Sequence, residues 1–238
     1  MIPGTANVLL VADHAGQDVP PDIDLGVGAE EMARHIAVDI GIASLIRQVA
    51  AELDAPAILA RLSRLVFDPN RDPRSPKLAP NLSDGTRIAG NVGLSSELLS
   101  VRRRFHTSYH MAIENQLERQ EVHLFVSLHS FTPNLRDRPD VVRPWDAALL
   151  YNNDDRTASE AIEFLREAGL NVGDNEPYSG IDTGYTVIRH AEGRGLPYLF
   201  LEIRQDHLAS ETGVALWSKR VAALVRHIQK DGKQDGAG

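Results

Sequence analysis

The sequence predicts an α/β protein in which a mostly parallel sheet is covered by helices on both faces, giving three layers. Short apolar runs at 7–12, 122–128 and 198–203 have the composition of strands buried on both faces. Segments with apolar residues at helical spacing alternate with these runs, which is typical of a parallel sheet with crossover helices. The 238 residues, 42% of them hydrophobic, are enough for one core. We therefore expect a single domain over residues 1–229.

The first half of the chain contains three predicted strands and two predicted helices. The strands are expected at 7–12, 56–60 and 65–67, and the helices at 30–53 and 96–120. Met32, Ile36 and Ile40 recur at helical spacing in the first helix. Ser95 is the expected N-cap of the second helix. The stretch 72–93 is rich in Pro and Gly and has no periodicity, so we expect a long loop there.

The second half continues the alternation of strands and helices. Strands are expected at 122–128, 147–151, 184–189 and 198–203, and helices at 154–168 and 210–229. Gly169 follows the first of these helices, as a glycine that ends a helix does. Residues 131–144 form an irregular stretch with three arginines. The polar, Gly-rich segment 230–238 is expected to be a disordered tail.

Composition narrows the class of protein. The net charge of −8 argues against a nucleic-acid-binding surface, so we expect no nucleic-acid partner. No apolar run of 18 residues is present and the first residues lack the pattern of a secretory signal, so we expect no membrane partner and a cytoplasmic location. The absence of cysteine excludes disulfides and thiolate metal sites. The sequence leaves the oligomeric state open.

Histidines follow two of the predicted strands and indicate a metal site. His14 comes just after the strand 7–12, and His129 just after the strand 122–128. Ligands bind beyond the carboxyl ends of strands in open α/β sheets, so both side chains are expected at one rim. One histidine after a strand is more often structural than a ligand. The helix 30–53, however, offers His35 or Asp39 as a third ligand, and these groups suit Zn²⁺ with a position left for water.

Glu202 lies inside the last apolar strand, where a carboxylate must be paired, bound to metal or protonated. It is therefore a candidate general acid/base. The alternative, a structural salt bridge with a nearby arginine, is equally compatible with the sequence. Arg204 points the same way from the strand and is a candidate either to hold Glu202 or to stabilise the substrate or its developing oxyanion.

A pair of histidines and a group of arginines are further candidates for functional sites. His106 and His110 form an H-x-x-x-H pair, but Thr107 stands where the zinc motif has Glu, so we interpret the pair as packing and hydrogen bonding. Arginines concentrate in the predicted loops of this acidic chain, which suits an anionic ligand. For any one of these arginines taken alone, ordinary solvated charge is the better explanation.

The chain resembles the N-formylglutamate amidohydrolases, also called N-formylglutamate deformylases. The matching motifs run in order from residue 12 to residue 206: A-D-H-A (12–15), H-I-A-V-D-I-G (35–41), S-R-L-V-F-D-P-N-R (63–71), F-H-T-S-Y-H (105–110), S-L-H-S-F-T-P (127–133), N-E-P-Y-S-G (175–180), G-Y-T-V-I-R-H (184–190) and L-E-I-R-Q-D (201–206). The resemblance implies a mixed sheet between helices, as in zinc exopeptidases and peptidoglycan amidases. It implies one Zn²⁺ per chain, held by His14, His129 and either His35 or Asp39, with Glu202 as the acid/base.

The resemblance also implies a substrate and its binding residues. The family hydrolyses N-formyl-L-glutamate to formate and L-glutamate, the last step of one histidine-degradation route. That substrate carries two carboxylates, which would give the loop arginines a role. The candidates for substrate binding are Arg71, Arg143, Arg189 and Arg204, followed by Asn70, Tyr178 and Ser179.

Two alternatives stay open at this point. The chain could hydrolyse another small amide, another N-acyl amino acid or a peptidoglycan-type amide. It could instead be a non-catalytic protein that binds an anionic ligand through the arginine loops without a metal.

Overall fold

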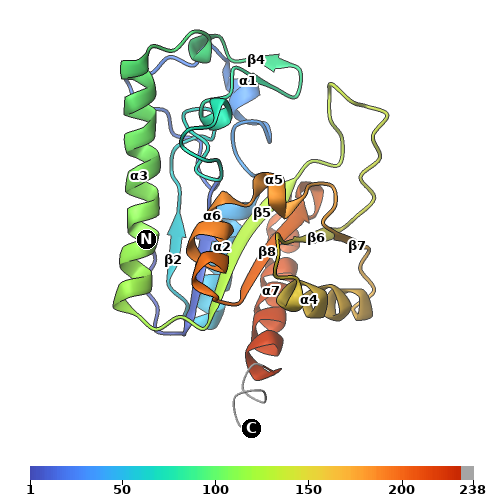
Figure 1. Cartoon of the computed structure of the whole chain (residues 1–238). Coiled ribbons are helices and arrows are strands. Elements are labelled where there is room, and N and C mark those ends of the chain that lie inside the picture. The colour runs from blue at the N-terminus through green and yellow to red at the C-terminus, as the bar shows by residue number, and fades with distance from the viewer. Residues whose placement is uncertain (232–238) are drawn as a thin grey trace.

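The structure is a computed structural model that describes residues 1–231. A six-stranded sheet forms its core. Figure 1 shows this sheet between the helices. The strands are β1 (Val8–Ala12), β2 (Ala57–Leu59), β5 (Leu124–Phe131), β6 (Ala147–Leu150), β7 (Val172–Asp174) and β8 (Tyr198–Arg204), in the order β2-β1-β5-β8-β6-β7. All neighbouring pairs are parallel except β6 and β8, which are antiparallel. The sheet is thus mixed and mostly parallel, as predicted.

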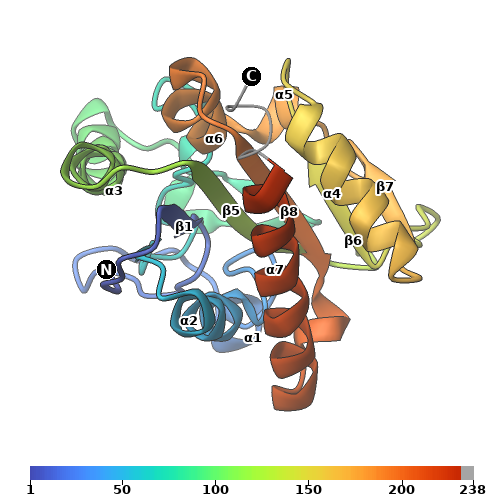
Figure 2. The same cartoon turned by 90° about the horizontal axis from the view of Figure 1, so that it is seen from below.

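Helices cover both faces of this sheet (Figure 2). One face carries α2 (Ile42–Leu53), α4 (Arg156–Glu167) and α7 (Glu211–Asp231), and the other carries α3 (Ser96–Arg119) and α6 (Tyr185–His190). The strands are buried on both faces: Val8 and Leu10 of β1 pack toward α2, whereas Leu9 and Val11 pack toward α3. Alternate residues of a strand face opposite ways, so an uninterrupted apolar run fits this position. The predicted three-layer α/β fold is confirmed.

Short elements connect these layers. They are α1 (Ala29–Met32), η1 (Pro76–Leu78), β3 (Leu82–Ser83), β4 (Thr86–Arg87), η2 (Ala89–Asn91), α5 (Gly180–Thr183), η3 (Glu192–Arg194) and η4 (Gln205–Leu208). The strands β3 and β4 form a small antiparallel hairpin inside the stretch predicted as a loop over 72–93. No helix in the described part of the chain has the length and apolar composition that a bilayer crossing requires.

The predicted long helix over 30–53 is wrong, because the chain leaves the helical path between α1 and α2. The backbone N–H of Asp39 donates to the carbonyl of His14, 2.9 Å away, instead of to a helical partner. Gly41 then has φ +80°, a left-handed conformation that glycine adopts without strain, and it begins α2. A side chain at Gly41 would collide with Leu208. This break turns residues 33–41 into a loop at the rim of the sheet.

Two predicted strands are also wrong. In place of the predicted strand at 65–67, residues 64–66 form a turn. The Ser63 hydroxyl accepts the N–H of Leu65, and the Ser63 carbonyl accepts the N–H of Val66. Residues 185–190 form helix α6 despite three β-branched residues in a row. The buried residues of α6 are Thr186, Val187 and His190, which are spaced as on one helical face.

Other boundaries moved by a few residues. Ser95 caps α3 as predicted, with its hydroxyl accepting the N–H of Leu98. Strand β5 continues to Phe131, so His129 lies inside the strand and not just beyond it. Helix α7 extends to Asp231, which includes the first residues of the predicted tail, and residues 232–238 lie outside the described residues.

Candidate active site

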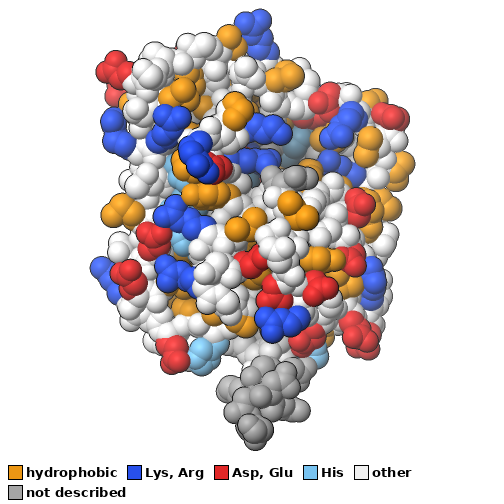
Figure 3. All heavy atoms as spheres, viewed as in Figure 1, with side chains coloured by type: hydrophobic (Ala, Val, Ile, Leu, Met, Phe, Trp, Pro, Cys, Tyr) orange, Lys and Arg blue, Asp and Glu red, His pale blue; other side chains and the backbone are white. Residues whose placement is uncertain are grey.

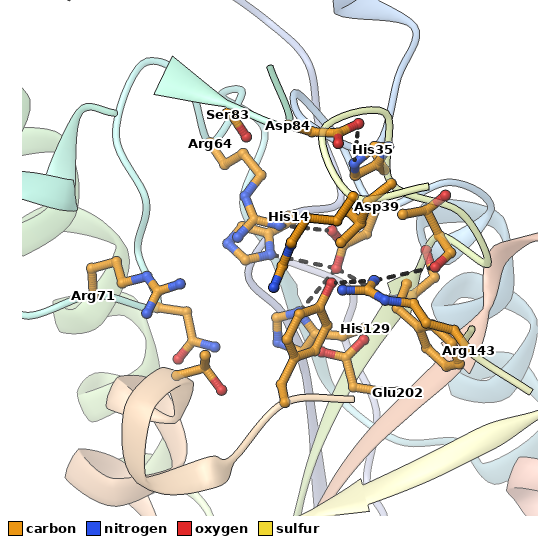
Figure 4. Close-up of a pocket in the computed structure, with 18 of the residues that line it drawn as sticks. His14, His35, Asp39, Arg64, Arg71, Ser83, Asp84, His129, Arg143 and Glu202 are labelled. Carbon is orange, nitrogen blue, oxygen red and sulfur yellow. Dashed lines mark hydrogen bonds and ion pairs between the residues drawn. The ribbon is translucent and has the colours of Figure 1, made fainter. Parts of the chain in front are cut away.

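A pocket of about 240 Å³ opens at the carboxyl ends of β1, β5 and β8 (Figure 4). The loop 33–41, the turn after Leu62 and the β3–β4 hairpin form its walls together with the stretch that follows β5. In the face seen in Figure 3, Lys and Arg side chains gather over this end of the sheet. The topology therefore brings residues that are distant in the sequence to one rim, as expected for an open α/β sheet.

His14, Asp39 and His129 form a buried group at the base of the pocket. Their ligand atoms all lie within 4.8 Å of one another. Asp39 Oδ2 lies 3.4 Å from His14 Nδ1 and 2.9 Å from His129 Nδ1. Both histidines thus turn the same ring nitrogen toward one carboxylate oxygen, which is an arrangement suited to a shared cation.

Carboxylates also contact the outer nitrogens of both rings. His14 Nε2 lies 2.7 Å from Asp68 Oδ1, and His129 Nε2 lies 3.2 Å from Asp13 Oδ2. Asp13 also accepts a 2.7 Å hydrogen bond from the hydroxyl of Tyr109. Metal-binding histidines commonly donate their other N–H to a carboxylate, which fixes the tautomer and leaves the inner nitrogen with its lone pair.

The neighbouring carboxylates favour positive charge at the centre of this group. Burial disfavours protonation of His14 and His129, yet the neighbouring carboxylates outweigh it and raise both pKa values. Burial also acts on Asp39, but the two histidines hold its pKa below the usual range. His14 Nδ1 is buried without a hydrogen-bond partner. Two imidazole nitrogens and one carboxylate are a donor set that catalytic zinc accepts, so the residues present fit Zn²⁺.

Glu202 stands beside this group. It is paired with His129 in the register of β5 and β8, and it is only 7% exposed. Its Oε2 has no hydrogen-bond partner, and burial raises the pKa of its carboxyl to about 7. A carboxylate in this state can accept and return a proton near neutral pH.

The sequence is similar to that of one protein family. The sequence matches the N-formylglutamate amidohydrolase family over residues 6–209, most of its length. The chain belongs to the N-formylglutamate amidohydrolase family. It is therefore a hydrolase that acts on amide bonds.

Solved structures with similar folds agree in architecture. The gene product Atu2144 from Agrobacterium tumefaciens is 29% identical, with a TM-score of 0.89 over 97% of this chain and 93% of that one. An N-formylglutamate amidohydrolase from Ralstonia eutropha JMP134 is 19% identical, with a TM-score of 0.66 over 96% of each chain. No curated protein sequence matches the chain.

Within this family fold, the structure groups Asp39 and not His35 with the two histidines. His35 lines the pocket farther up, where its Nε2 lies 3.4 Å from Asp84 Oδ2. Burial lowers its pKa to about 4. Because residues 33–41 are a loop, the helical spacing that would have put His35 and Asp39 on one face is absent. His35 is therefore a wall residue of the pocket.

Four of the predicted substrate-binding residues line the pocket, namely Asn70, Arg71, Arg143 and Tyr178. Arg143 is buried and donates from Nη1 to the carbonyl of Thr132 at 3.2 Å and to the hydroxyl of Tyr178 at 2.8 Å. Its Nε has no hydrogen-bond partner. No carboxylate in the described part of the chain forms an ion pair with Arg143, whereas Arg71 Nε lies 3.7 Å from Asp68.

The other three predicted site residues have structural roles instead. Arg204 ends β8 and points to Asp206, with Nε 2.8 Å from Oδ1. In the described part of the chain it forms no ion pair with Glu202 and does not line the pocket. Arg189 forms an ion pair with Glu114 on α3, at 2.7 Å. Ser179 caps α5 by accepting the N–H of Ile181. The strand expected over 184–189 is a helix, which changes the direction of Arg189.

Sequence reasoning missed Arg64 and Asp68. Arg64 bridges the site, with Nη1 3.3 Å from Asp39 and Nη2 3.0 Å from Asp68. Both residues lie in the motif S-R-L-V-F-D-P-N-R, and their spacing of four was the available signal. The predicted strand at 65–67 would separate the two side chains and so conceals this signal.

Proposed function

We propose that the chain hydrolyses N-formyl-L-glutamate to formate and L-glutamate with one zinc ion. One observation supports this most: a buried guanidinium without a carboxylate partner, that of Arg143, lines the same small pocket as the His14–Asp39–His129 group and Glu202. A buried charge without a counter-ion is costly, so the site favours an anionic ligand. Membership of the family indicates that the scissile bond is an amide. The unpaired arginine in the pocket favours an acidic amino acid as the substrate.

His14, Asp39 and His129 would hold the metal, and Asp68 and Asp13 would orient the two imidazoles. Zinc would polarise the formyl carbonyl and make a water molecule acidic enough to attack it at neutral pH. Arg64 balances the charge of Asp39 and Asp68 and keeps both carboxylates in place.

Glu202 performs the proton transfers. Its unpartnered Oε2 accepts a proton from the attacking water, and the same atom returns a proton to the leaving nitrogen as the C–N bond breaks. The products are then formate and the free amine of L-glutamate. Burial makes the carboxyl a weak enough acid to serve in both directions.

Arginines on the pocket wall bind the two carboxylates of the substrate. Figure 4 shows Arg71 on one side of the His14–His129 pair and Arg143 on the other side in this view. Arg143 is held rigid by Thr132 and Tyr178, and its guanidinium lies 4.9 Å from the centre of the Tyr178 ring. Asn70 and Arg71 provide the second contact. With this substrate, the chain would catalyse the last step of a histidine-degradation route, which we expect to run in the cytoplasm.

Hydrolysis of a different N-acyl amino acid is the main second candidate. The pocket of about 240 Å³ suits a small molecule better than a peptidoglycan strand. A non-catalytic binding protein would have no use for a buried, unpartnered Glu202.

The test is formate release from N-formyl-L-glutamate by purified protein, before and after chelation and after zinc is restored. Activity that disappears with the chelator and returns with zinc supports the proposal. Zinc binding without formate release would reject this substrate, and a panel of N-acetyl and N-succinyl amino acids would then identify the acyl group.

A further inference from the structure

Three histidines lie buried beside the pocket without lining it. His106 and His110 are on α3 and His190 is on α6, and each is at most 1% exposed. The His106 and His110 ring centres are 4.3 Å apart, and the His110 and His190 rings are stacked at 5.0 Å. The catalytic mechanism described above does not use them.

The hydrogen bonds of these histidines determine which ring nitrogens carry a proton. His110 Nε2 lies 2.9 Å from the carbonyl of Pro69, which can only accept, so this nitrogen donates. Neutral His110 then has a bare Nδ1, which accepts from His190 Nε2 at 2.8 Å. His106 Nε2 likewise donates to the carbonyl of Arg71 at 3.0 Å.

The carbonyls that accept from His110 and His106 belong to one short loop, residues 68–71, and this loop contains several residues of the site. Asp68 contacts His14, while Asn70 and Arg71 line the pocket. Asn70 Oδ1 accepts the backbone N–H of Thr186 on α6, at 3.0 Å. Helices α3 and α6 therefore hold the loop from outside through two ring N–H donors and one backbone donor.

We propose that His106, His110 and His190 are positioning residues that hold the loop 68–71 so that Asp68 orients the metal ligand His14 and Arg71 faces the substrate. The assignment of roles to Asp68 and Arg71 rests on the proposed function. The histidines never touch the substrate, and their effect passes through the carbonyls of Pro69 and Arg71.

Burial keeps the protonation state of these histidines constant at ordinary pH. It lowers the pKa of His110 to about 3 and that of His190 to about 4, and it also lowers the pKa of His106. All three rings therefore stay neutral at ordinary pH and donate from the same nitrogen throughout.

The first part of the test measures substrate binding in two variants of His106 whose side-chain amides differ in length. His106→Gln can place its N–H near the Arg71 carbonyl, whereas the shorter His106→Asn cannot. We expect His106→Asn to raise KM for N-formyl-L-glutamate about 10-fold with little change in kcat, because a small displacement of a binding group is costly. His106→Gln should stay within about 3-fold of the parent, and so should the exposed control His123→Gln.

A double-mutant cycle shows whether the effect passes through Arg71. In an Arg71→Ala background, His106→Asn should change KM less than about 2-fold, since the group that it positions is already gone. Equal increases in both backgrounds, or a Gln variant as impaired as the Asn variant, would overturn the proposal.

The metal arm does not depend on the substrate. We expect His110→Phe to weaken zinc binding about 10-fold in competition with a chelator, because the hydrogen bond from His14 to Asp68 loosens. His110→Gln should restore most of that affinity. Unchanged zinc affinity in His110→Phe would overturn the positioning role even if the parent protein released no formate, whereas absence of formate release alone would reject only the proposed substrate.

Discussion

His14 Nε2 lies 2.7 Å from Asp68 Oδ1, and this buried contact joins residues 54 positions apart in the chain. It presents the opposite nitrogen of His14 to Asp39 and leaves that nitrogen without a hydrogen-bond partner. The contact therefore prepares one ligand of the candidate metal site before any metal arrives.

Removal of the Asp68 carboxylate should weaken the metal site without emptying it. We expect Asp68→Ala to raise the zinc dissociation constant by about 10- to 100-fold, because His14 loses its orienting partner. Arg64 also loses one of its two carboxylates. Chelator competition on the purified variant measures this, and the exposed Asp22→Ala serves as the control. Parent-like zinc affinity in Asp68→Ala would contradict the role of this contact.

Glu202 should be needed for turnover and not for metal. We expect Glu202→Gln to keep one zinc per chain and to lose about 10²- to 10⁴-fold in kcat, because the amide cannot take the proton. The glutamine has nearly the same shape, so the thermal midpoint should change little. Metal analysis and formate release on the same sample give both quantities. Near-parent kcat would show that another group transfers the proton.

Arg143 should select for a carboxylate on the substrate. Arg143→Met should raise KM for N-formyl-L-glutamate by about 10-fold or more, since a charge-assisted pair contributes about 1.5–3 kcal/mol. N-formyl-L-glutamine lacks one carboxylate, so the variant should discriminate less between these two substrates than the parent does. The exposed Arg47→Met on α2 is the matched control. An unaltered ratio of kcat/KM for the two substrates would remove Arg143 from carboxylate recognition.

The buried histidines should make the free energy of unfolding depend on pH. His110 and His190 have folded-state pKa values of about 3 and about 4, below the ordinary 6.5. The unfolded chain therefore binds protons between pH 6.5 and about 4 that the folded chain does not, so stability is full above pH 6.5 and falls as the pH drops through this window. Each histidine contributes a slope of about 1.4 kcal/mol per pH unit.

Urea unfolding at several pH values checks this slope. His110→Gln removes one titrating group and should lose less stability than the parent between pH 6.5 and 4. The metal-site groups titrate in both proteins and cancel in the comparison. Parallel curves for the two proteins would mean that His110 is not held neutral in the folded state.

The residues that could be located from the sequence are those whose placement depends on strand ends. Apolar runs indicate β1, β5 and β8, and a parallel arrangement brings their carboxyl ends together, so the sequence locates His14, His129 and Glu202. The choice between His35 and Asp39 could not be made, because it depends on how the loop 33–41 leaves the helix. That path is set by the bond from the Asp39 N–H to the His14 carbonyl, a contact between distant segments.

The errors share a physical cause, since tertiary contacts overrode local preference. Thr186, Val187 and Ile188 favour a strand by their branched side chains. They form a helix here because that places Thr186 and His190 against the loop 68–71 and α3. Arg189 is consequently directed to Glu114 and does not line the pocket. Strand β8 extends one residue beyond the predicted strand and includes Arg204, whose partner Asp206 lies in the following turn η4.

Zinc content measured together with formate release from N-formyl-L-glutamate, in the parent and in His129→Ala, tests the central claim most directly. The account predicts about one zinc per parent chain, with formate release that follows zinc through chelation and restoration, and neither property in a folded His129→Ala variant. A parent that takes up no zinc when it is supplied, or a His129→Ala variant that retains both properties, would contradict the metal site formed by His14, Asp39 and His129.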